Sequence, residues 1–278
     1  MVLMSTPDAR TVLVTGATDG LGRAVAEHLA ASGATVLLHG RDPGRLRRAA
    51  DEIRSATGNE RVSGYLADLA SLDQVRSLAA EIRRDHDRLH VLVSNAGIGS
   101  LPAGRQTSAD GHELRFAVNY LAGFLLTMEL LPLLTVSAPA RIVNVASLGQ
   151  HPIDFDDVMI ERGYSASRAY GQGKLAQISS GFELAGRLQP GQVTVNSLHP
   201  GTYMPTKMVL ISREPVDTLE TGVDSTARLA ASPDLDQVSG RFYDRQQEAR
   251  AHPQAYDLEA RQRLWQLSRK LTGAPDPP

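Results

Sequence analysis

Short apolar runs alternate with helix-like stretches over the first 200 or so residues of this 278-residue chain. The runs are rich in β-branched residues and read TVLVT at 11–15, ATVLLH at 34–39, RVSGYLAD at 61–68, LHVLVSNAG at 89–97, ARIVNVAS at 140–147 and QVTVNSLHPG at 192–201. Strands that are apolar on both sides and separated by helices are typical of a parallel sheet covered by helices on both faces. The pattern therefore predicts a doubly wound α/β fold of the Rossmann type.

The stretches between these runs predict helices, because they are rich in alanine, leucine and arginine. We expect helices that end near Ser32, begin at Pro43 and Ser71, extend through Leu131 and span 170–188. Asp42 before Pro43 is a favourable N-cap with proline at the first helical position. Ser71 and Gln74 have the spacing of a capping box. Two helix starts are therefore predicted by local chemistry as well as by composition.

Composition excludes several classes of function. With 42% hydrophobic residues, 22% charged residues and a net charge of -2, the chain is ordinary globular material with no sign of a nucleic-acid partner. It contains no cysteine, which excludes disulfides, thiol nucleophiles and cysteine ligands, and its histidines show no metal-binding spacing. We therefore expect no metal site.

The N-terminus and the apolar runs bear on location and domain organisation. The first residues, MVLMSTPDAR, lack the apolar core of a signal peptide, and no apolar run reaches the roughly 20 residues that a membrane helix needs. We expect a cytoplasmic protein that does not bind a membrane. No linker rich in proline, glycine or serine divides the chain, so one domain is predicted at 11–272, between tails at 1–10 and 273–278.

The first run ends in a glycine-rich segment, TGATDGLG at 15–22. In a parallel sheet the ligand lies beyond the carboxyl ends of the strands, and a helix that begins there directs free N–H groups toward a phosphate. Gly16 permits a tight turn, Gly20 a close approach of the backbone, and Gly22 the packing of helix against strand. Three glycines after a strand also occur in plain turns, but the strand before them and the helix after them favour a nucleotide site.

The stretch YSASRAYGQGK at 164–174 holds two tyrosines and one lysine. Tyr170 and Lys174 are four residues apart and share one face of a helix, whereas Tyr164 has no basic residue at that spacing. A tyrosine titrates near pH ~10, and lowering its pKa by about 3 requires about 4 kcal/mol of preference for the phenolate. A lysine one turn away contributes to that preference. The alternative is a surface tyrosine and lysine that share a helix face.

Five separated motifs occur in the order found in the short-chain dehydrogenase/reductase family, which the chain resembles over about residues 11–245. They are TGATDGLG at 15–22, SNAG at 94–97, Ser147 at the end of VNVAS, YGQGK at 170–174 and HPGT at 199–202. The segments DFDD at 154–157 and LWQLSRKLTG at 264–273 are similar to the retinol-dehydrogenase-like and WW-domain-oxidoreductase-like branch of that family.

The resemblance implies hydride transfer with four catalytic residues. Tyr170 would exchange a proton with the carbonyl or alcohol oxygen, and Ser147 would hydrogen-bond the same oxygen. Lys174 would bind the nicotinamide ribose and, together with the oxidised nicotinamide, lower the Tyr170 pKa. Asn119 would hold a water that supplies protons to Lys174; a polar residue at a helix kink is the alternative. Gly173 departs from the family's small hydroxyl residue, so either the cofactor or a partner helix approaches closely there or the helix is loose.

Cofactor choice depends on the loop after the second run, VLLHGRD. Gly40 stands where an NAD enzyme would carry a carboxylate, and Arg41 follows it. In the family this arrangement favours NADP over NAD, because the guanidinium pairs with the 2′-phosphate; a solvated surface arginine is the alternative. The resemblance implies cofactor contacts from Gly16, Thr18, Asp19, Gly20, Leu21, Arg41, Asp68, Leu69, Asn95, Ala96, Gly97, Tyr170, Lys174, Pro200, Gly201 and Thr202.

The stretch after Thr202, YMPTKMVLISREPVD, mixes apolar residues with prolines and predicts a lid over the site. We expect an apolar carbonyl or secondary alcohol as substrate. The expected pocket lining is Leu148, His151, Met204 and Met208. Core packing or an oligomer contact explains the methionines equally well. Tyr164 is expected to border this pocket, and His199 to pack beside the turn.

Two classes of function remain open. The complete set of catalytic residues favours an NADP-dependent reductase or dehydrogenase acting on a small-molecule carbonyl or alcohol. The alternative is a non-catalytic, nucleotide-sensing binding protein on the same fold. A sugar-nucleotide epimerase is disfavoured by the GxxxGxG spacing. Because helices like those around Asn119 and Tyr170 pair between subunits in many family members, the small residues Gly171, Ala176 and Ser180 predict a homodimer or homotetramer.

Overall fold

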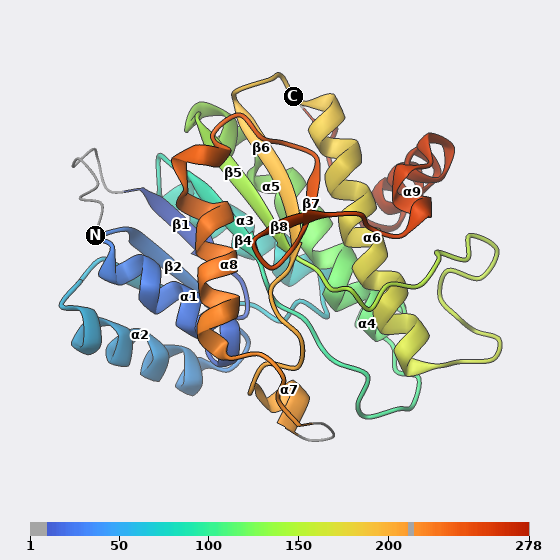
Figure 1. Ribbon diagram of the computed structural model, residues 1–278, viewed down its shortest axis with the longest axis horizontal. Coiled ribbons are helices and arrows are strands. Elements are labelled where there is room, and N and C mark those ends of the chain that lie inside the picture. The colour runs from blue at the N-terminus through green and yellow to red at the C-terminus, as the bar shows by residue number, and fades with distance from the viewer. Residues whose placement is uncertain (1–9, 211–213, 278) are drawn as a thin grey trace.

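A computed structural model describes residues 10–210 and 214–277, and the strands of this part of the chain form one sheet (Figure 1). The order is β3-β2-β1-β4-β5-β6-β7-β8, with neighbours parallel except for β7 and β8. The strands are β1 (Thr11–Val14), β2 (Thr35–Gly40), β3 (Val62–Leu66), β4 (Val91–Ser94), β5 (Ala140–Val145), β6 (Val193–His199), β7 (Arg241–Asp244) and β8 (Gln247–Ala249). The predicted doubly wound α/β fold is confirmed.

Helices cover both faces of this sheet. α1, α2 and α8 pack on one face around Val12 and Val14, and α3, α5 and α6 pack on the other around Leu13, because successive strand residues point to opposite faces. The helices are α1 (Gly20–Ala31), α2 (Pro43–Thr57), α3 (Leu72–Asp85), α4 (Leu114–Phe116), η1 (Ala117–Leu121), α5 (Ala122–Val136), α6 (Ala166–Arg187), α7 (Lys207–Leu210), α8 (Leu219–Ala231), η2 (Pro233–Leu235), η3 (Pro253–Tyr256) and α9 (Leu258–Thr272).

The two predicted helix starts are confirmed. The Asp42 carboxylate accepts a hydrogen bond from the Arg45 backbone N–H at 2.8 Å, with Pro43 at the first helical position. The Ser71 hydroxyl accepts from the Gln74 N–H at 3.4 Å. Each side chain satisfies an N–H group that has no partner within its helix.

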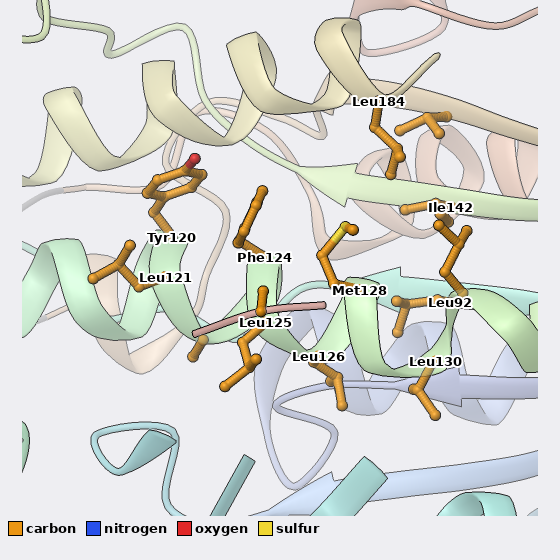
Figure 2. Packing of buried hydrophobic residues seen from close by; sticks show 14 of the residues in the cluster. Leu92, Tyr120, Leu121, Phe124, Leu125, Leu126, Met128, Leu130, Ile142 and Leu184 are labelled. Atoms are coloured by element: carbon orange, nitrogen blue, oxygen red, sulfur yellow. The ribbon is translucent and has the colours of Figure 1, made fainter. Parts of the chain in front are cut away.

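The long helix predicted through Leu131 differs from expectation in its first part. It begins as the single turn α4, passes through the π-helical turn η1 and continues as α5 to Val136. By length and composition Leu114–Val136 could cross a membrane, so the expectation of no such segment is wrong. In the structure, however, 72% of its most apolar window is buried. Figure 2 shows Tyr120, Phe124 and Met128 from this segment in the core.

The C-terminal helix α9 packs onto α5 and α6, a contact that the sequence pattern did not predict. The Trp265 ring meets the Phe124 ring edge-on at 5.1 Å between centroids, and the Arg187 guanidinium lies over the Trp265 ring at 4.7 Å. The Ser268 and Tyr120 hydroxyls are 2.5 Å apart. Ala176 on α6 is fully buried within the chain, and so it offers no surface to a second subunit.

Candidate functional site

The candidate site lies at the carboxyl ends of β1 and β4, where the strand order reverses and open α/β sheets bind ligands. Two residues join these strand ends. The Thr15 hydroxyl accepts hydrogen bonds from the Asn95 and Ala96 N–H groups at 2.9 and 3.0 Å. The Asn95 amide donates to the Thr15 carbonyl at 2.8 Å. The SNAG segment and the glycine-rich segment therefore form one rigid edge.

The glycines of this edge are required by close approach. Gly16 has a φ of +66°, and a Cβ added there would lie 2.9 Å from the Ala96 Cα. A Cβ on Gly22 would lie 2.3 Å from the Gly16 carbonyl oxygen. Gly20, with a φ of +53°, begins α1, and its N–H donates to the Asp19 carboxylate at 2.8 Å. A backbone exposed without side chains at a helix start suits a pyrophosphate.

Ser147 and Tyr170 are brought together beside this edge, as predicted. Ser147 follows β5, and its hydroxyl hydrogen-bonds the Tyr170 hydroxyl and accepts from the Gly149 N–H at 3.0 Å. Burial raises the Tyr170 pKa, and the Ser147 hydrogen bond opposes that rise. The lowering of the Tyr170 pKa by Lys174, which the resemblance implies, is not seen in the protein alone, where burial sets the direction of the shift.

Lys174 is buried on the same helix, with its Nζ 6.0 Å from the centre of the Tyr170 ring. The ammonium donates to the Val145 carbonyl at 2.7 Å and to Oε1 of Gln177 at 3.4 Å. Burial lowers the Lys174 pKa to about 8, since desolvation disfavours the charged form. The lysine is thus held inside the protein by neutral oxygens.

Asn119 lies in the π-helical turn η1 and reaches across to the loop after β4. Its Oδ1 accepts from the Ile98 N–H at 2.7 Å, and its Nδ2 donates to the Ile98 carbonyl at 3.0 Å. A Cβ on Gly97 would lie 3.3 Å from Oδ1 of Asn119 and 3.6 Å from Nζ of Lys174. Asn119 and Lys174 therefore converge on Gly97. π-helical turns of this kind are frequent at functional sites.

The two glycines of the YGQGK motif have different surroundings. A Cβ on Gly171 would lie 3.0 Å from the backbone nitrogen of His151 and 3.2 Å from the Gly149 carbonyl oxygen. A Cβ on Gly173 would make ordinary contacts of 3.5 Å with Asn119 and 3.6 Å with the Arg115 carbonyl oxygen. A close approach therefore explains Gly171 but not Gly173, whose ordinary contacts are made by residues of the same chain.

The end of the site that follows β2 is where the adenosine part of the cofactor is expected, and we call it the adenosine end. Arg41 is exposed there and forms no hydrogen bond or ion pair with the described residues. Asp19 in the glycine-rich segment pairs with Arg45 at 2.9 Å and with Lys207 of α7 at 2.5 Å. These contacts and the Gly20 N–H lower the Asp19 pKa, the Lys207 hydrogen bond most of all. Arg45 and Lys207 were not predicted, because neither stands in a motif and only the fold brings them to Asp19.

His39 near the end of β2 is a further residue that the sequence analysis did not predict. Its Nδ1 accepts from the Gly16 N–H at 3.2 Å, so Nε2 carries the proton and donates to the Ala67 carbonyl at 3.0 Å. Burial lowers the His39 pKa, which favours this neutral ring. Asp68 follows Ala67 and accepts from the Ala70 N–H at 3.0 Å, while Leu69 is buried. Through His39, the segment that carries Asp68 and Leu69, two of the expected cofactor contacts, is linked to the glycine-rich segment.

Thr202 ends the turn after β6 and is fixed by two residues distant in sequence. Its N–H donates to the Asp217 carboxylate at 2.6 Å, and the Arg245 guanidinium donates to its hydroxyl at 3.3 Å. Arg245 also pairs with Asp217 at 2.5 Å. His199 is buried with Nε2 3.1 Å from the Thr202 hydroxyl, and burial lowers its pKa. The prediction that His199 packs beside the turn is confirmed.

Only some of the residues expected to line the substrate pocket are exposed beside the candidate site. Leu148 and His151 are exposed next to Ser147. Met204 is buried below Gly201, so core packing explains it. The side chain of Met208 lies outside the described residues.

Tyr164 belongs to a buried polar cluster rather than to a proton relay. Its hydroxyl donates to the Glu113 carboxylate at 2.9 Å and accepts from Arg115 at 2.7 Å. Burial and the Glu113 carboxylate raise the Tyr164 pKa to about 12. Arg115 is 1% exposed and also donates to the Gly99 and Pro102 carbonyls. The cluster ties the loop after β4 to the segment before α6.

A family model described as short chain dehydrogenase matches residues 10–215. Retinol dehydrogenase 13 of Homo sapiens is 38% identical over 291 residues, which cover 98% of this chain and 87% of the relative. Retinol dehydrogenase 14 of Homo sapiens is 39% identical over 292 residues, covering 95% and 86%. Both similarities extend over nearly the whole chain.

Solved structures with a similar fold include a short chain dehydrogenase. An uncharacterized protein from Mycobacterium paratuberculosis superposes with a TM-score of 0.78 at 30% identity, covering 97% of this chain and 95% of that one. A short chain dehydrogenase from Shigella flexneri, complexed with NADP, has a TM-score of 0.70 at 29% identity, covering 85% and 97%. The fold therefore has solved counterparts.

Proposed function

Because the chain belongs to the short-chain dehydrogenase family and is similar to its retinol dehydrogenases, we propose that it is an NADP-dependent oxidoreductase. It transfers hydride between the nicotinamide and an apolar carbonyl or secondary alcohol. The observation that carries this proposal is the convergence of Asn119 and Lys174 on Gly97, beside the hydrogen-bonded pair of Ser147 and Tyr170. A protein that only senses a nucleotide would not need this arrangement.

The protein's own part in the chemistry is to hold the reacting oxygen and move a proton. Tyr170 donates the proton to the carbonyl oxygen or removes it from the alcohol, and Ser147 donates a hydrogen bond to the same oxygen. When bound, the nicotinamide cofactor supplies or accepts the hydride, and its oxidised ring adds a positive charge that favours the phenolate. Lys174 binds the ribose and Asn119 holds the loop that carries Gly97 in place.

Arg41 supports NADP as the cofactor. Its guanidinium is exposed just after β2 and pairs with none of the residues that the structure describes, so it can form charge-assisted hydrogen bonds with a 2′-phosphate. Gly40 leaves no carboxylate for the ribose of NAD at the same position. Solved relatives that are complexed with NADP or NADPH are consistent with this choice.

Exposed apolar side chains support an apolar substrate. Among the large hydrophobic residues most exposed in the described chain are Leu148 beside Ser147, Leu101 in the loop after β4, and Tyr203, Leu210 and Val216 in the segment between β6 and α8. All of them follow carboxyl ends of the strands that carry the site. The names of the curated relatives suggest a retinoid as a first compound to test.

The deciding experiment measures NADPH oxidation with retinal and with a panel of aliphatic and aromatic aldehydes and ketones. Turnover that is abolished in Tyr170→Phe, while NADPH still binds, supports the proposal. NADPH binding without turnover of any compound by the unaltered protein would instead favour the nucleotide-sensing alternative. A cytoplasmic location and a homodimer or homotetramer stay predictions, to be tested by cell fractionation and light scattering.

A further inference from the structure

A small internal cavity lies behind the catalytic end of α6, between α5, α6 and β5. Its volume is about 20 Å³, which is room for about one water molecule. Ser94, Asn144 and Gln177 contribute polar atoms to its wall. Figure 2 shows part of the apolar wall, formed by Tyr120 of η1 and Phe124 of α5. Neither Asn119 nor Lys174 lines the cavity, so the cavity is distinct from the candidate catalytic site.

Asn144 and Ser94 bring unpaired hydrogen-bonding groups to this cavity. Both residues are 7% exposed, and among the described residues no hydrogen bond is made by the Asn144 amide or the Ser94 hydroxyl. A Cβ on Gly181 would lie 2.9 Å from Nδ2 of Asn144, and a Cβ on Gly123 would lie 2.8 Å from the Ser94 hydroxyl oxygen. These two glycines keep the space in front of the polar groups open.

The polar groups in the cavity wall favour a water molecule as its occupant. Leaving a buried amide unpaired costs about 1–3 kcal/mol, whereas a buried water pairs with about 2–4 polar groups. Asn144 offers donors and an acceptor, and the Ser94 hydroxyl offers both as well. No charged side chain lines the cavity, and its volume is sufficient for a water molecule.

Gln177 connects the cavity to the catalytic lysine. Its Oε1 accepts from Nζ of Lys174 at 3.4 Å, and its Nε2 donates to the Ser94 carbonyl at 3.2 Å. Both bonds require the same orientation of the amide, so Gln177 is fixed between the lysine and the end of β4. The other acceptor of the ammonium is the Val145 carbonyl.

We propose that the cavity binds one ordered water molecule, held by Asn144 and Ser94, and that this water and Gln177 together stabilise the buried Lys174 ammonium from its inner side. Gln177 is then a positioning residue that acts through Lys174. The titratable groups that face this region are the phenols of Tyr170, near Nζ, and Tyr120, in the cavity wall. No carboxylate in the wall compensates the ammonium, so neutral acceptors determine how readily it stays protonated.

The chain is suited to a direct test because it contains only three lysines, Lys174, Lys207 and Lys270. Protein labelled with ¹³C at the lysine ε-carbon gives three NMR signals, which single Lys→Arg variants assign. We expect Gln177→Met to lower the Lys174 pKa by about one pH unit, and Asn144→Leu, which fills the cavity and removes the amide, to lower it by less. Ser179→Ala is the matched control, because Ser179 is buried on the same helix but does not line the cavity.

An unchanged Lys174 pKa in Gln177→Met or in Asn144→Leu would overturn the proposal. Should either variant fail to fold, a high-resolution crystal structure of the unaltered protein decides the question. It is expected to show one water within hydrogen-bond distance of the Asn144 amide, and a dry cavity or an Asn144 side chain turned to another partner would contradict us. Neither measurement needs turnover, so both are independent of the proposed activity.

Discussion

At the catalytic end of the candidate site, Lys174 and Asn119 have their hydrogen-bond partners inside the protein. At the end expected to bind the adenosine part of the cofactor, Arg41, Arg45 and Asp19 lie toward solvent. At the catalytic end, burial changes pKa values, and the side chains are fixed by neutral groups of the backbone and of other side chains. At the adenosine end, charges interact across water and are screened by salt. Catalysis at the first end is therefore expected to depend on the fixed positions of side chains. Cofactor affinity at the second end is expected to depend on the balance of charge.

The largest effect is expected from Tyr170→Phe, which removes the proton donor of the catalytic end. Turnover should fall by about 10²-fold or more, while the Kd for NADPH stays nearly unchanged. Steady-state kinetics and a fluorescence titration of NADPH measure the two quantities. Tyr164→Phe is the control: it breaks the bonds to Glu113 and Arg115, so it should lower the free energy of unfolding by about 1–3 kcal/mol and reduce turnover far less. Retained turnover in Tyr170→Phe would contradict the assignment of Tyr170 as the proton donor.

The second effect tests the adenosine end. Arg41→Ala removes a charge-assisted contact with the 2′-phosphate of about 1.5–3 kcal/mol, which is roughly a 10- to 150-fold loss of NADPH affinity. NADH affinity should barely change, because NADH has no phosphate at that position. The loss should shrink as salt is raised. Equal losses for both cofactors, or tighter binding of NADH by the unaltered protein, would show that Arg41 is only a surface residue.

The third effect separates the two glycines of α6. Gly171→Ala should lower the free energy of unfolding by about 1–3 kcal/mol, because the new Cβ meets backbone atoms of the 149–151 segment that follows Ser147. Gly173→Ala is the matched control, and it should be neutral or raise stability by up to about 1 kcal/mol, since the site has room and alanine favours a helix. Urea unfolding of both variants measures this. Equal destabilisation would mean that the catalytic end is no more tightly packed at Gly171 than at Gly173.

The smallest effect is expected from Asp19→Asn. The substitution keeps a good N-cap for α1 but releases Arg45 and Lys207, so NADPH affinity should rise by about 2- to 5-fold at low salt. Glu27→Gln makes the same change of charge on the same helix, away from the glycine-rich segment, and should leave affinity unchanged. Weaker binding in Asp19→Asn would indicate that Asp19 itself contacts the cofactor.

Features that depend on neighbours along the chain could be predicted from the sequence. The strands, the N-caps at Asp42 and Ser71, and the helical pairing of Tyr170 with Lys174 each follow from a short segment and a fixed period. Ser147 was identified through the order of family motifs, and Asn119 as a match to the family's fourth catalytic position. The structure places both beside Tyr170 and Lys174, although the local pattern alone could not have shown this.

Features that depend on distant residues could not be predicted. Arg115 is charged and reads as a surface residue, yet the fold buries it among carbonyl groups and Tyr164. Gln177 stands in no motif, and its proposed role follows from its contact with Ser94 at the end of β4, which is distant in sequence. The π-helical turn at Asn119 lies in a sequence that favours an ordinary helix. In each case tertiary contacts outweigh the local preference.

The position of α9 has a consequence for quaternary structure. Because Trp265 and Ser268 already cover α5 and α6, a second copy approaching from this side would first encounter the outer surface of α9. The exposed residues there include Gln262, Arg263, Gln266 and Lys270, which are polar or charged. A dimer formed through this side would have a polar interface that is weakened by salt. We therefore expect that a homodimer or homotetramer, if formed, does not bury an apolar face of α5 and α6 on this side.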